Sequence, residues 1–491
     1  MVRTRKKKVG AIGLRTWNAM NEREQDRALR MGYLPPMAGG SFTSDAMESN
    51  IFGMWAAMQA DGRGTPADMT TGSKMLRWVG GDITTARTDG TEDYSDNTLF
   101  GPTVDFVNTI VGNGSLQIQA QPGTLGWLAW LASGQETATG GANDVQTLTS
   151  TATGGTIGLS MNGYECTFAW DATAAEIVTA FTAAQNVSDV SLPSGCVTAT
   201  GGPLGTNPVV LTAAAPLNNM PWPTITVDNS AATGGTAEIA HTTVGEGITH
   251  VATPNDAGGF WSTWFKAVGS STQIKHQYND CRISSLMVEA SSASKVAKVT
   301  PALMSLDPGE IQATNPTKED DGTIPFIYTE GAGSWTIDDI VFRGHSAFSM
   351  TATWGLQEWY GDDVVPYALV NTRASVALNA ITIILDGEGL GEYNQIIYGQ
   401  RTPPTGSKPL HTVSPLGSYQ CAFSKVSPYT GIVQASASFD FPTMKWDPGL
   451  SITPNVAGGP IELPLAGAFR KQPGQVPFSI TTVNQDAAYT V

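Results

Sequence analysis

The chain has 491 residues, of which 27 are basic and 43 are acidic, so its net charge is −16. This length allows about two to four domains with at least one large core, and the charge argues against a protein whose whole surface binds nucleic acid. Charged residues make up only 14% of the chain while Gly and Pro number 54 and 29, a mixture typical of an all-β protein with many turns.

Residues 1–60 carry most of the clustered charge, and we interpret them as an N-terminal arm with helices and a basic tip. The tip consists of Arg3, Arg5, Lys6, Lys7 and Lys8. Trp17–Arg30 predicts a solvent-facing or docking helix, with a mobile terminus as the alternative, and Asp45–Gln59 predicts a second helix. Val9–Leu14 is too short for a signal sequence, and the longest apolar runs fall below the ~20 residues of a membrane span. We therefore expect a soluble protein made in the cytoplasm.

Residues 61–137 have the pattern of the first part of a β core. Lys74–Val79 predicts a strand, whereas the polar, acidic stretch Asp82–Gly101 predicts a solvated loop. Two further strands are predicted at Val104–Val111 and Ser115–Gln121, with a hairpin turn across the glycines between them, Gly112 and Gly114.

The strand at Ser115–Gln121 alternates between two kinds of side chain. Its apolar residues fall on one face and its glutamines on the other, the latter being Gln117, Gln119 and Gln121. Such alternation predicts one face against a core and one in water. The next segment, Thr124–Ser133, is short and apolar almost all round, which predicts a buried helix.

Between residues 138 and 247 charged residues nearly vanish, and Thr, Ala and Gly dominate. Strand patterns here surround one helix expected to be capped by Asp171, which makes a complete α+β unit. Because the surrounding β pattern stops near residue 134 and resumes near 248, we interpret 138–247 as a domain inserted into a loop of the core. The four cysteines lack metal-site spacing, so we expect reduced thiols, with a Cys166–Cys196 disulfide as the alternative.

The stretch from Asn255 to Gly309 has the densest pattern in the chain. Asn255 and Asp256 can cap a helix, since the apolar residues between Phe260 and Val268 recur at helical spacing. A strand pair follows, beginning with Arg282–Ala290. In that strand the apolar residues Leu286, Val288 and Ala290 share one face, and the opposite face carries Ser285, Met287 and Glu289.

Residues 248–440 together are interpreted as the second part of the core, and residues 441–491 as a C-terminal extension. Strand-sized pieces recur in this part, Tyr393–Tyr398 among them, and Asp386–Gly391 is a predicted turn. No long helical pattern is found after residue 270.

The sequence offers no catalytic signature. The run Gly387–Gly391 lacks the third well-placed glycine of a dinucleotide site and is predicted to be a β-turn. The five histidines stand singly, without a second metal ligand at usable spacing. Asp320–Asp321 and Asp362–Asp363 fit solvated turns or, alternatively, a calcium site or an acid pair. We predict that the protein is not an enzyme and has no catalytic, metal-binding or cofactor-binding residues.

The run from Phe260 to Gly309, FWSTWFKAVGSSTQIKHQYNDCRISSLMVEASSASKVAKVTPALMSLDPG, resembles the tail tube proteins of long-tailed bacteriophages. The segment 138–247, with its GGT…NG…DATAAEI pattern, resembles a small domain that recurs as an insertion in virion proteins. These resemblances imply a mainly β fold, a tail-tube β-barrel or sandwich with a flanking helix, plus an inserted small α+β domain.

The same resemblance implies a structural role in the virion tail. Subunits assembled in the host cytoplasm would stack as hexameric rings into a tube, and DNA would pass through the lumen without specific binding. The tape-measure protein and the tail terminator or baseplate proteins would be further partners, and no membrane contact is expected.

Three groups of residues are candidates for this role. The water-facing residues of the two best strands are predicted to line the lumen, with an outward orientation as the alternative: Gln117, Gln119, Gln121, Ser285, Met287 and Glu289. The acidic loop is predicted to stack one ring on the next through Asp82, Arg87, Asp89, Glu92, Asp93 and Asp96. The basic tip, Arg3 with Arg5 and Lys6–Lys8, is predicted to pair with an adjacent ring, and nucleic-acid binding is its alternative.

Two other classes of protein remain open. A capsid decoration, baseplate or fibre protein would share this composition and the inserted domain. A β-sandwich protein that binds or hydrolyses glycans is the second alternative. The inserted domain is expected on the outside of a tube, where it would meet cell-surface glycans.

Overall fold

The computed structural model describes residues 52–70, 72–93, 103–255, 258–269, 273–317, 323–331, 335–342, 345–410, 412, 416–450, 452, 461–470 and 472–489. The chain divides into two units, one of residues 1–52 and 267–275 and the other of residues 53–266 and 276–491.

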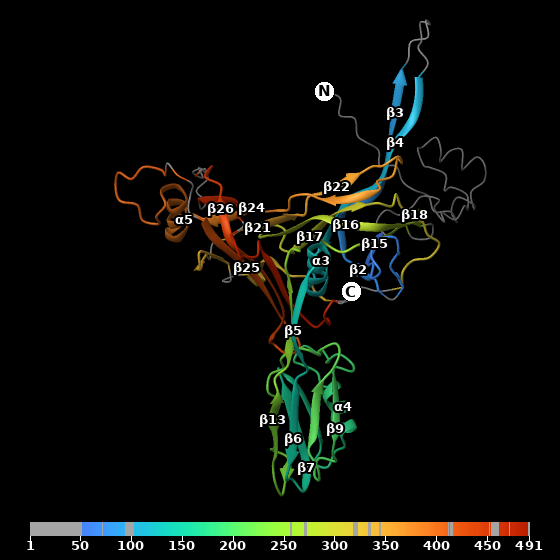
Figure 1. Cartoon of the computed structure of the whole chain (residues 1–491). Coiled ribbons are helices and arrows are strands. Elements are labelled where there is room, and N and C mark those ends of the chain that lie inside the picture. Colours follow the sequence, from blue (N-terminus) through green and yellow to red (C-terminus); the bar gives the residue numbers. More distant parts are fainter. Residues whose placement is uncertain are drawn as a thin grey trace, which may run out of the picture. The chain divides into compact units, whose positions relative to one another are not determined.

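The protein is mainly β, as its composition predicts, with 51% strand and 9% helix. Its largest sheet among the described residues contains 18 strands. The central section of this sheet is antiparallel throughout and follows the order β3 (Trp78–Asp93), β4 (Thr103–Gln119), β17 (Lys298–Ser305), β16 (Ile274–Ser291), β21 (Ala347–Thr353), β24 (Ser375–Ile384) and β27 (Glu462–Phe469). Several of these strands are labelled in Figure 1.

Beyond β27 the sheet continues through strands from the late part of the chain and then through strands from its earlier part. β27 pairs with β26 (Val433–Trp446), and β26 also pairs with β25 (Leu416–Val426) and with β28 (Ser479–Asn484). β28 pairs with β14 (Glu246–Ala252), which pairs with β5 (Glu136–Ala142). The predicted C-terminal extension, residues 441–491, thus supplies the two strands β27 and β28 to the sheet.

Shorter elements complete the core. They are β1 (Phe52–Met58), β2 (Lys74–Leu76), β15 (Ser262–Val268), β18 (Glu310–Ile311), β19 (Thr336–Ile337), β20 (Ile340–Val341), β22 (Leu356–Trp359), β23 (Ala368–Asn371) and the 3-10 helix η1 (Tyr328–Gly331). Within the described part of the chain, no helix has the length and apolar character needed to cross a membrane.

The helix α3 (Pro122–Ser133) is buried along its whole length, which confirms the prediction for Thr124–Ser133. Pro122 begins it, where a missing N–H costs no helical hydrogen bond. Gly134 ends it in the left-handed conformation, with φ 75, and donates its N–H to Trp130 O. A helix that is apolar all round can only be a core helix, and this one packs against β28 and β14.

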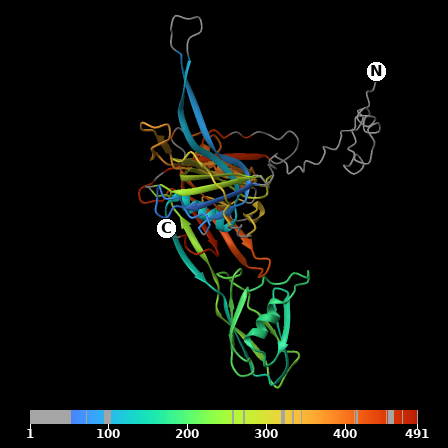
Figure 2. The same cartoon turned by 90° about the vertical axis from the view of Figure 1, so that its right-hand side faces the viewer.

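The residues of segment 138–247 form sheets and a core of their own. One sheet has the order β13 (Ala237–Thr243), β6 (Val145–Ser150), β10 (Val209–Ala213) and β9 (Val197–Gly201). The other is built around β7 (Gly154–Met161), with β8 (Tyr164–Ala169), β11 (Thr226–Asp228) and β12 (Ala232–Thr233). In both views the ribbons of this segment group together, and β5 and β14 lead into and out of them (Figure 1, Figure 2).

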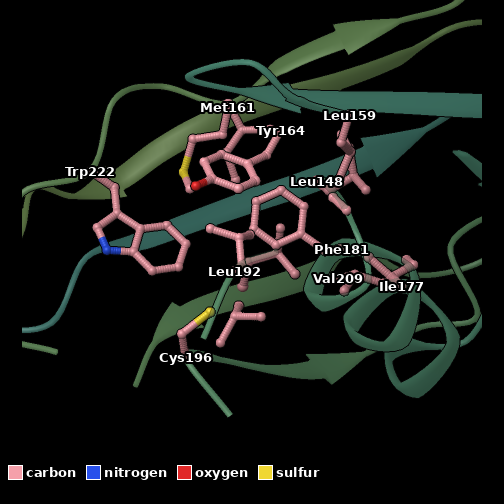
Figure 3. Close-up of a cluster of buried hydrophobic side chains, with 14 of the residues drawn as sticks. Leu148, Leu159, Met161, Tyr164, Ile177, Phe181, Leu192, Cys196, Val209 and Trp222 are labelled. Atoms are coloured by element: carbon pink, nitrogen blue, oxygen red, sulfur yellow. The ribbon is translucent and has the colours of Figure 1, made fainter. Parts of the chain in front are cut away.

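The core of this segment surrounds the helix α4 (Ala174–Thr182), whose buried residues Ile177 and Phe181 face the sheets (Figure 3). The cap is Thr173, which forms a capping box with Glu176, and not Asp171 as predicted. Cys196 lies in this core, and all four cysteines are free. Reduced thiols are therefore confirmed, and the alternative Cys166–Cys196 disulfide is not formed.

The predicted helix at 255–268 is wrong, because Ser262–Val268 is the strand β15. Six of its seven residues are buried, so apolar side chains point to both sides of the strand. A short apolar run of this kind fits helical spacing and a doubly buried strand equally well. Asp256, the second expected cap, lies outside the described residues. The second predicted helix, at 45–59, fails likewise, since Phe52–Met58 is the strand β1.

The predicted hairpin turn at Gly112–Gly114 is also wrong, because β4 continues through it. Each glycine instead allows another chain segment to come close. A Cβ on Gly114 would lie 2.0 Å from Asp82 O, and one on Gly112 would lie 2.6 Å from Asp307 O. Glycine within a strand here marks close backbone packing and not a turn.

The predicted turn at Asp386–Gly391 and the predicted strand at Tyr393–Tyr398 together form the helix α5 (Gly387–Tyr398). Asp386 caps it by accepting hydrogen bonds from the N–H groups of Glu388 and Gly389. Gly389 is needed because a Cβ there would lie 2.4 Å from Ile384 O. The three glycines concealed the capping signal of Asp386.

Candidate functional site

Where β4, β17, β16 and β21 pair, they bury one face of the sheet. Leu116 and Ile118 of β4, Leu286 and Val288 of β16, Val299 of β17 and Met350 of β21 are all at most 1% exposed. Each of these residues alternates with a partly exposed neighbour. The alternation predicted for 115–120 and 285–290 is therefore confirmed.

The opposite face of these four strands is polar, and we call it the polar face. It consists of Ser115, Gln117 and Gln119 of β4, Lys298, Thr300 and Ala302 of β17, Ser285, Met287 and Glu289 of β16, and Ser349, Thr351 and Thr353 of β21. Directly opposed residues in paired strands point to the same side. Gln119 opposes Lys298, which opposes Glu289, which opposes Ser349. The structure thus brings five of the six predicted lumen residues onto one surface.

The sixth residue, Gln121, does not belong to this surface, and its predicted exposure is wrong. It is fully buried, and its Nε2 donates to Thr323 O at 2.7 Å. The strand has ended by this point, because Gln121 precedes α3 and occupies its N-cap position. The alternation of a strand cannot be extended into the cap of a helix.

The polar face is electrically neutral, because its two charged residues have opposite signs, and both belong to one hydrogen-bonded cluster. Gln117 Nε2 donates to Glu289 Oε1 at 3.0 Å, and Lys298 Nζ donates to Gln117 Oε1 at 3.3 Å. Lys298 and Glu289 themselves lie 4.0 Å apart. They are the one basic and the one acidic residue of the polar face as defined, so its charge is +1 − 1 = 0.

Sequence reasoning missed Lys298 and the β21 residues of the polar face. A usable signal was present, since Lys298, Thr300 and Ala302 alternate with buried Val299 and Leu303. What the sequence does not show is that β17 lies between β4 and β16.

The residues predicted to stack rings occupy a two-stranded ribbon and not a loop. The ribbon comprises residues 85–93 of β3 and 103–112 of β4, paired from Thr85↔Gly112 to Asp93↔Thr103. β17 joins β4 only from Gly112 onwards. Threonine recurs along this part of β3, and such β-branched residues favour a strand in spite of the acidic side chains.

The structure separates the predicted stacking residues. Asp82 lies before the ribbon, where its carboxylate accepts from Lys266 Nζ at 2.9 Å and 3.0 Å, and the Lys266 side chain is 8% exposed. Arg87 and Asp89 form an exposed ion pair of 2.7 Å within the ribbon. Glu92 and Asp93 end β3, and Asp96 lies outside the described residues.

The basic tip, with Arg3, Arg5, Lys6, Lys7 and Lys8, also lies outside the described residues.

The glycine run Gly387–Gly391 and the histidine His241, considered above for cofactor or metal binding, take part in structural hydrogen bonds. The Gly387–Gly391 run itself forms the start of the helix α5, and the Asp386 carboxylate already accepts from the first-turn N–H groups, where a phosphate would bind. The buried Asp144 carboxylate accepts a hydrogen bond from His241 Nε2 at 2.7 Å, and it also accepts from the N–H groups of Trp222 and Gly245. In the described residues, no three His, Cys, Asp or Glu side chains are placed to hold a metal ion.

An open depression of about 560 Å³ lies beside β25 and β26, where Asp338, Ser418, Thr443, Gln472 and Gln475 form part of its lining. Among the described residues of that lining Asp338 is the one carboxylate, and its Oδ1 accepts from Ser418 N at 2.7 Å. Hydrolysis of a glycosidic bond by the usual route requires two carboxyl groups. The described part of the lining supplies one of these two groups.

Comparison of the chain with protein-family models and with curated proteins found no match.

Proposed function

We propose that this protein is a structural virion component, the major tail tube subunit of a long-tailed bacteriophage. Its copies assemble into hexameric rings, and the rings stack into a tube that conducts DNA. The observation that supports this proposal best is the polar face, which extends over four antiparallel strands with its residues in cross-strand register.

A neutral polar surface suits the passage of DNA. Lysine or arginine in a lumen would bind phosphates with release of counterions and would hold the duplex. On the polar face the one lysine, Lys298, is already paired with Glu289 and Gln117. Since charges are screened over about 8 Å at physiological salt, only groups close to the duplex act on it. The proposed lumen residues are Gln117, Gln119, Ser285, Met287 and Glu289.

The ribbon supports a role in assembly, for a reason that concerns its stability. A two-stranded ribbon is marginally stable alone in water, and unpaired strand edges favour association with other chains. Contact with a neighbouring ring would cover the ribbon, so we assign ring stacking to it, with Arg87 and Asp89 on its exposed surface. The basic tip, Arg3–Lys8, is proposed to pair with an acidic surface of the next ring.

The proposal implies partners and a location. Tape-measure, terminator and baseplate proteins would contact the tube, which forms in the host cytoplasm and remains in the virion tail. No bond is made or broken in this role, so we propose no enzymatic activity and no cofactor.

Negative-stain electron microscopy of the purified chain tests the proposal. Tubes or rings with a central lumen are the expected result. Particles that remain monomeric at every concentration, or that form assemblies without a lumen, would contradict it and would favour a decoration, baseplate or glycan-binding protein.

A further inference from the structure

The last described residues of the chain, 485–489, are bound to the large sheet and to α3, and we call them the C-terminal strap. Tyr489 N donates to Glu136 Oε2 of β5 at 3.0 Å, and the Tyr489 hydroxyl donates to Gly123 O of α3 at 3.2 Å. The Tyr489 ring stacks on the ring of His250 in β14, with the ring centres 4.4 Å apart. Figure 1 labels β5 and α3.

Two further contacts hold the strap. Asn219 Nδ2, in the segment 138–247, donates to Gln485 O at 3.4 Å. Lys74 Nζ of β2 donates to Asp486 Oδ2 at 2.9 Å. Since β5 leads into the segment and β14 leads out of it, the strap contacts the segment itself and both of its connections to the large sheet.

The His250 ring is almost fully buried, with 2% of its side chain exposed, and both of its nitrogens face polar atoms. Nε2 lies 3.0 Å from Asn484 Oδ1. That atom is the amide oxygen and not the amide nitrogen, because it also accepts from Asp486 N at 2.8 Å. His250 Nε2 must therefore carry a hydrogen.

The other ring nitrogen faces a buried carboxylate. His250 Nδ1 is hydrogen-bonded to Glu136 Oε1, and the Glu136 side chain is 5% exposed. A hydrogen must lie between these two atoms, since two lone pairs in contact would repel each other. His250 and Glu136 together thus hold one proton more than a neutral imidazole and an ionised carboxylate would hold. The strap depends on this proton, because Tyr489 covers the ring and is bonded to the second oxygen of the same carboxylate.

The charged groups beside this pair balance each other. Lys74 and Asp486 form an ion pair, and Lys74 Nζ lies 5.6 Å from the centre of the Tyr489 ring. The other elements packed here, α3 and β28, contain no charged residue. Loss of the shared proton would leave the buried Glu136 carboxylate facing a lone pair of His250, and such a charge is costly to bury.

We propose that the C-terminal strap is a pH-dependent device, which is closed while His250 and Glu136 share this proton and opens when the proton is lost. The strap does not depend on whether the chain builds a tube. An imidazole in water gives up its proton near about pH 6.5, so above that pH the open strap holds one proton fewer than the closed strap. Rising pH therefore favours opening, by up to about tenfold for each pH unit. Below about pH 4.3 a carboxyl group in water takes up a proton of its own, so the strap is closed most firmly between these two values.

Opening has a consequence for the segment 138–247. It removes the hydrogen bond of Asn219 with Gln485 and uncovers the His250 ring between the two connections of the segment. The segment then keeps fewer contacts with the rest of the chain at alkaline pH than at slightly acidic pH.

Hydrogen exchange of the full chain, measured by mass spectrometry, tests this proposal. The Tyr489 amide is a direct reporter, because it donates to Glu136 in the closed strap. From about pH 6.5 to about pH 8.5 its protection factor, which already corrects for the intrinsic exchange rate, should fall at least about tenfold. A protection factor that stays constant over this range would overturn the proposal.

Glu136→Gln separates the role of the proton from a merely structural contact. A glutamine can accept from Tyr489 N with its oxygen and donate to His250 Nδ1 with its amide group, so a neutral His250 satisfies every bond. The strap of this variant should stay closed at about pH 8.5, where Tyr489 should be better protected than in wild type. A structural contact alone predicts lower protection of the variant at every pH, and that result would overturn the proposal.

Two more variants complete the test. Tyr489→Ala removes the ring from His250, so the strap should be unprotected at every pH. His276→Gln changes a histidine outside the site and should keep the pH response of wild type; a lost response would place the titrating group elsewhere and overturn the assignment. The amides of α3, which is buried along its whole length, should stay protected in every variant and so show that the fold is intact.

Discussion

Replacing Glu289 by Lys tests whether the polar face lines a channel for DNA. In the wild type Lys298 and Glu289 lie 4.0 Å apart, and Gln117 is bonded to both. Glu289→Lys changes the charge of the face from zero to +2 per subunit, or about +12 around the proposed hexameric ring. Each lysine that reaches a phosphate adds about −0.9 to the slope of log K against log salt for DNA binding.

The fold should tolerate this change. Like charges directly opposed on paired strands cost about 0.2–1 kcal/mol, and solvent screens these two positions because the side chains are 23% and 32% exposed. Two controls isolate the effect of charge. Lys298→Glu gives a face of −2, and the double variant Glu289→Lys with Lys298→Glu restores zero.

The assay is DNA ejection from virions that carry each variant, measured at several salt concentrations. Glu289→Lys should slow or block ejection, added salt should relieve the block, and the charge-swapped double variant should eject like wild type. Lys298→Glu should not slow ejection. Normal ejection by Glu289→Lys virions with intact tubes would refute the placement of the polar face in the lumen. Gln119→Lys should act in the same direction as Glu289→Lys.

Three further predictions concern the ribbon, the segment 138–247 and a buried acid. Deleting residues 86–111 and joining the strands by an Asn-Gly turn should leave soluble rings or monomers under the electron microscope, and tubes of normal length would contradict ring stacking by the ribbon. Replacing residues 143–245 by a short Gly-Ser linker should leave tubes intact, because β5 and β14 still pair; loss of tubes would show a structural role. Burial, with Asp338 nearby, raises the pKa of Glu392 to about 7 in spite of Arg401 at 2.8 Å. Since this pKa lies above the ordinary 4.5, the folded protein binds the proton on Glu392 more tightly than the unfolded chain does. The protonated Glu392 therefore contributes its full stabilisation below about pH 4.5, and about 3 kcal/mol of it is lost as the pH rises through about 7. Glu392→Gln should flatten that part of the stability profile in thermal melts between pH 5 and 8, and an unchanged profile would contradict the assignment.

Features that depend on a few neighbouring residues could be predicted from the sequence. The helix α3 was predictable because Leu125, Trp127, Leu128, Trp130 and Leu131 leave no polar side for solvent. The buried and open faces of β4 and β16 were predictable because a strand has a period of two residues.

Features that depend on distant segments could not be predicted in the same way. β17 separates β4 from β16, so the ion pair of Lys298 with Glu289 follows from register and not from local pattern. The identity of β15 as a strand depends on burial of both its faces by the rest of the core. The glycines of β4 looked like a turn because the segments that approach them, at Asp82 and Asp307, are remote in sequence.

Net charge imposes a condition on any assembly of this chain. Copies that each carry −16 repel, so the surfaces that meet must be locally neutral or of opposite sign. The basic tip Arg3–Lys8 is of the second kind. Salt distinguishes the two. Screening weakens repulsion between acidic copies that meet at a neutral apolar surface and so favours their assembly, whereas it weakens an attraction between the basic tip and an acidic ring. Assembly that strengthens from about 0.05 to 0.5 M salt would therefore identify the neutral apolar contact as the dominant one, and assembly that weakens would identify the tip.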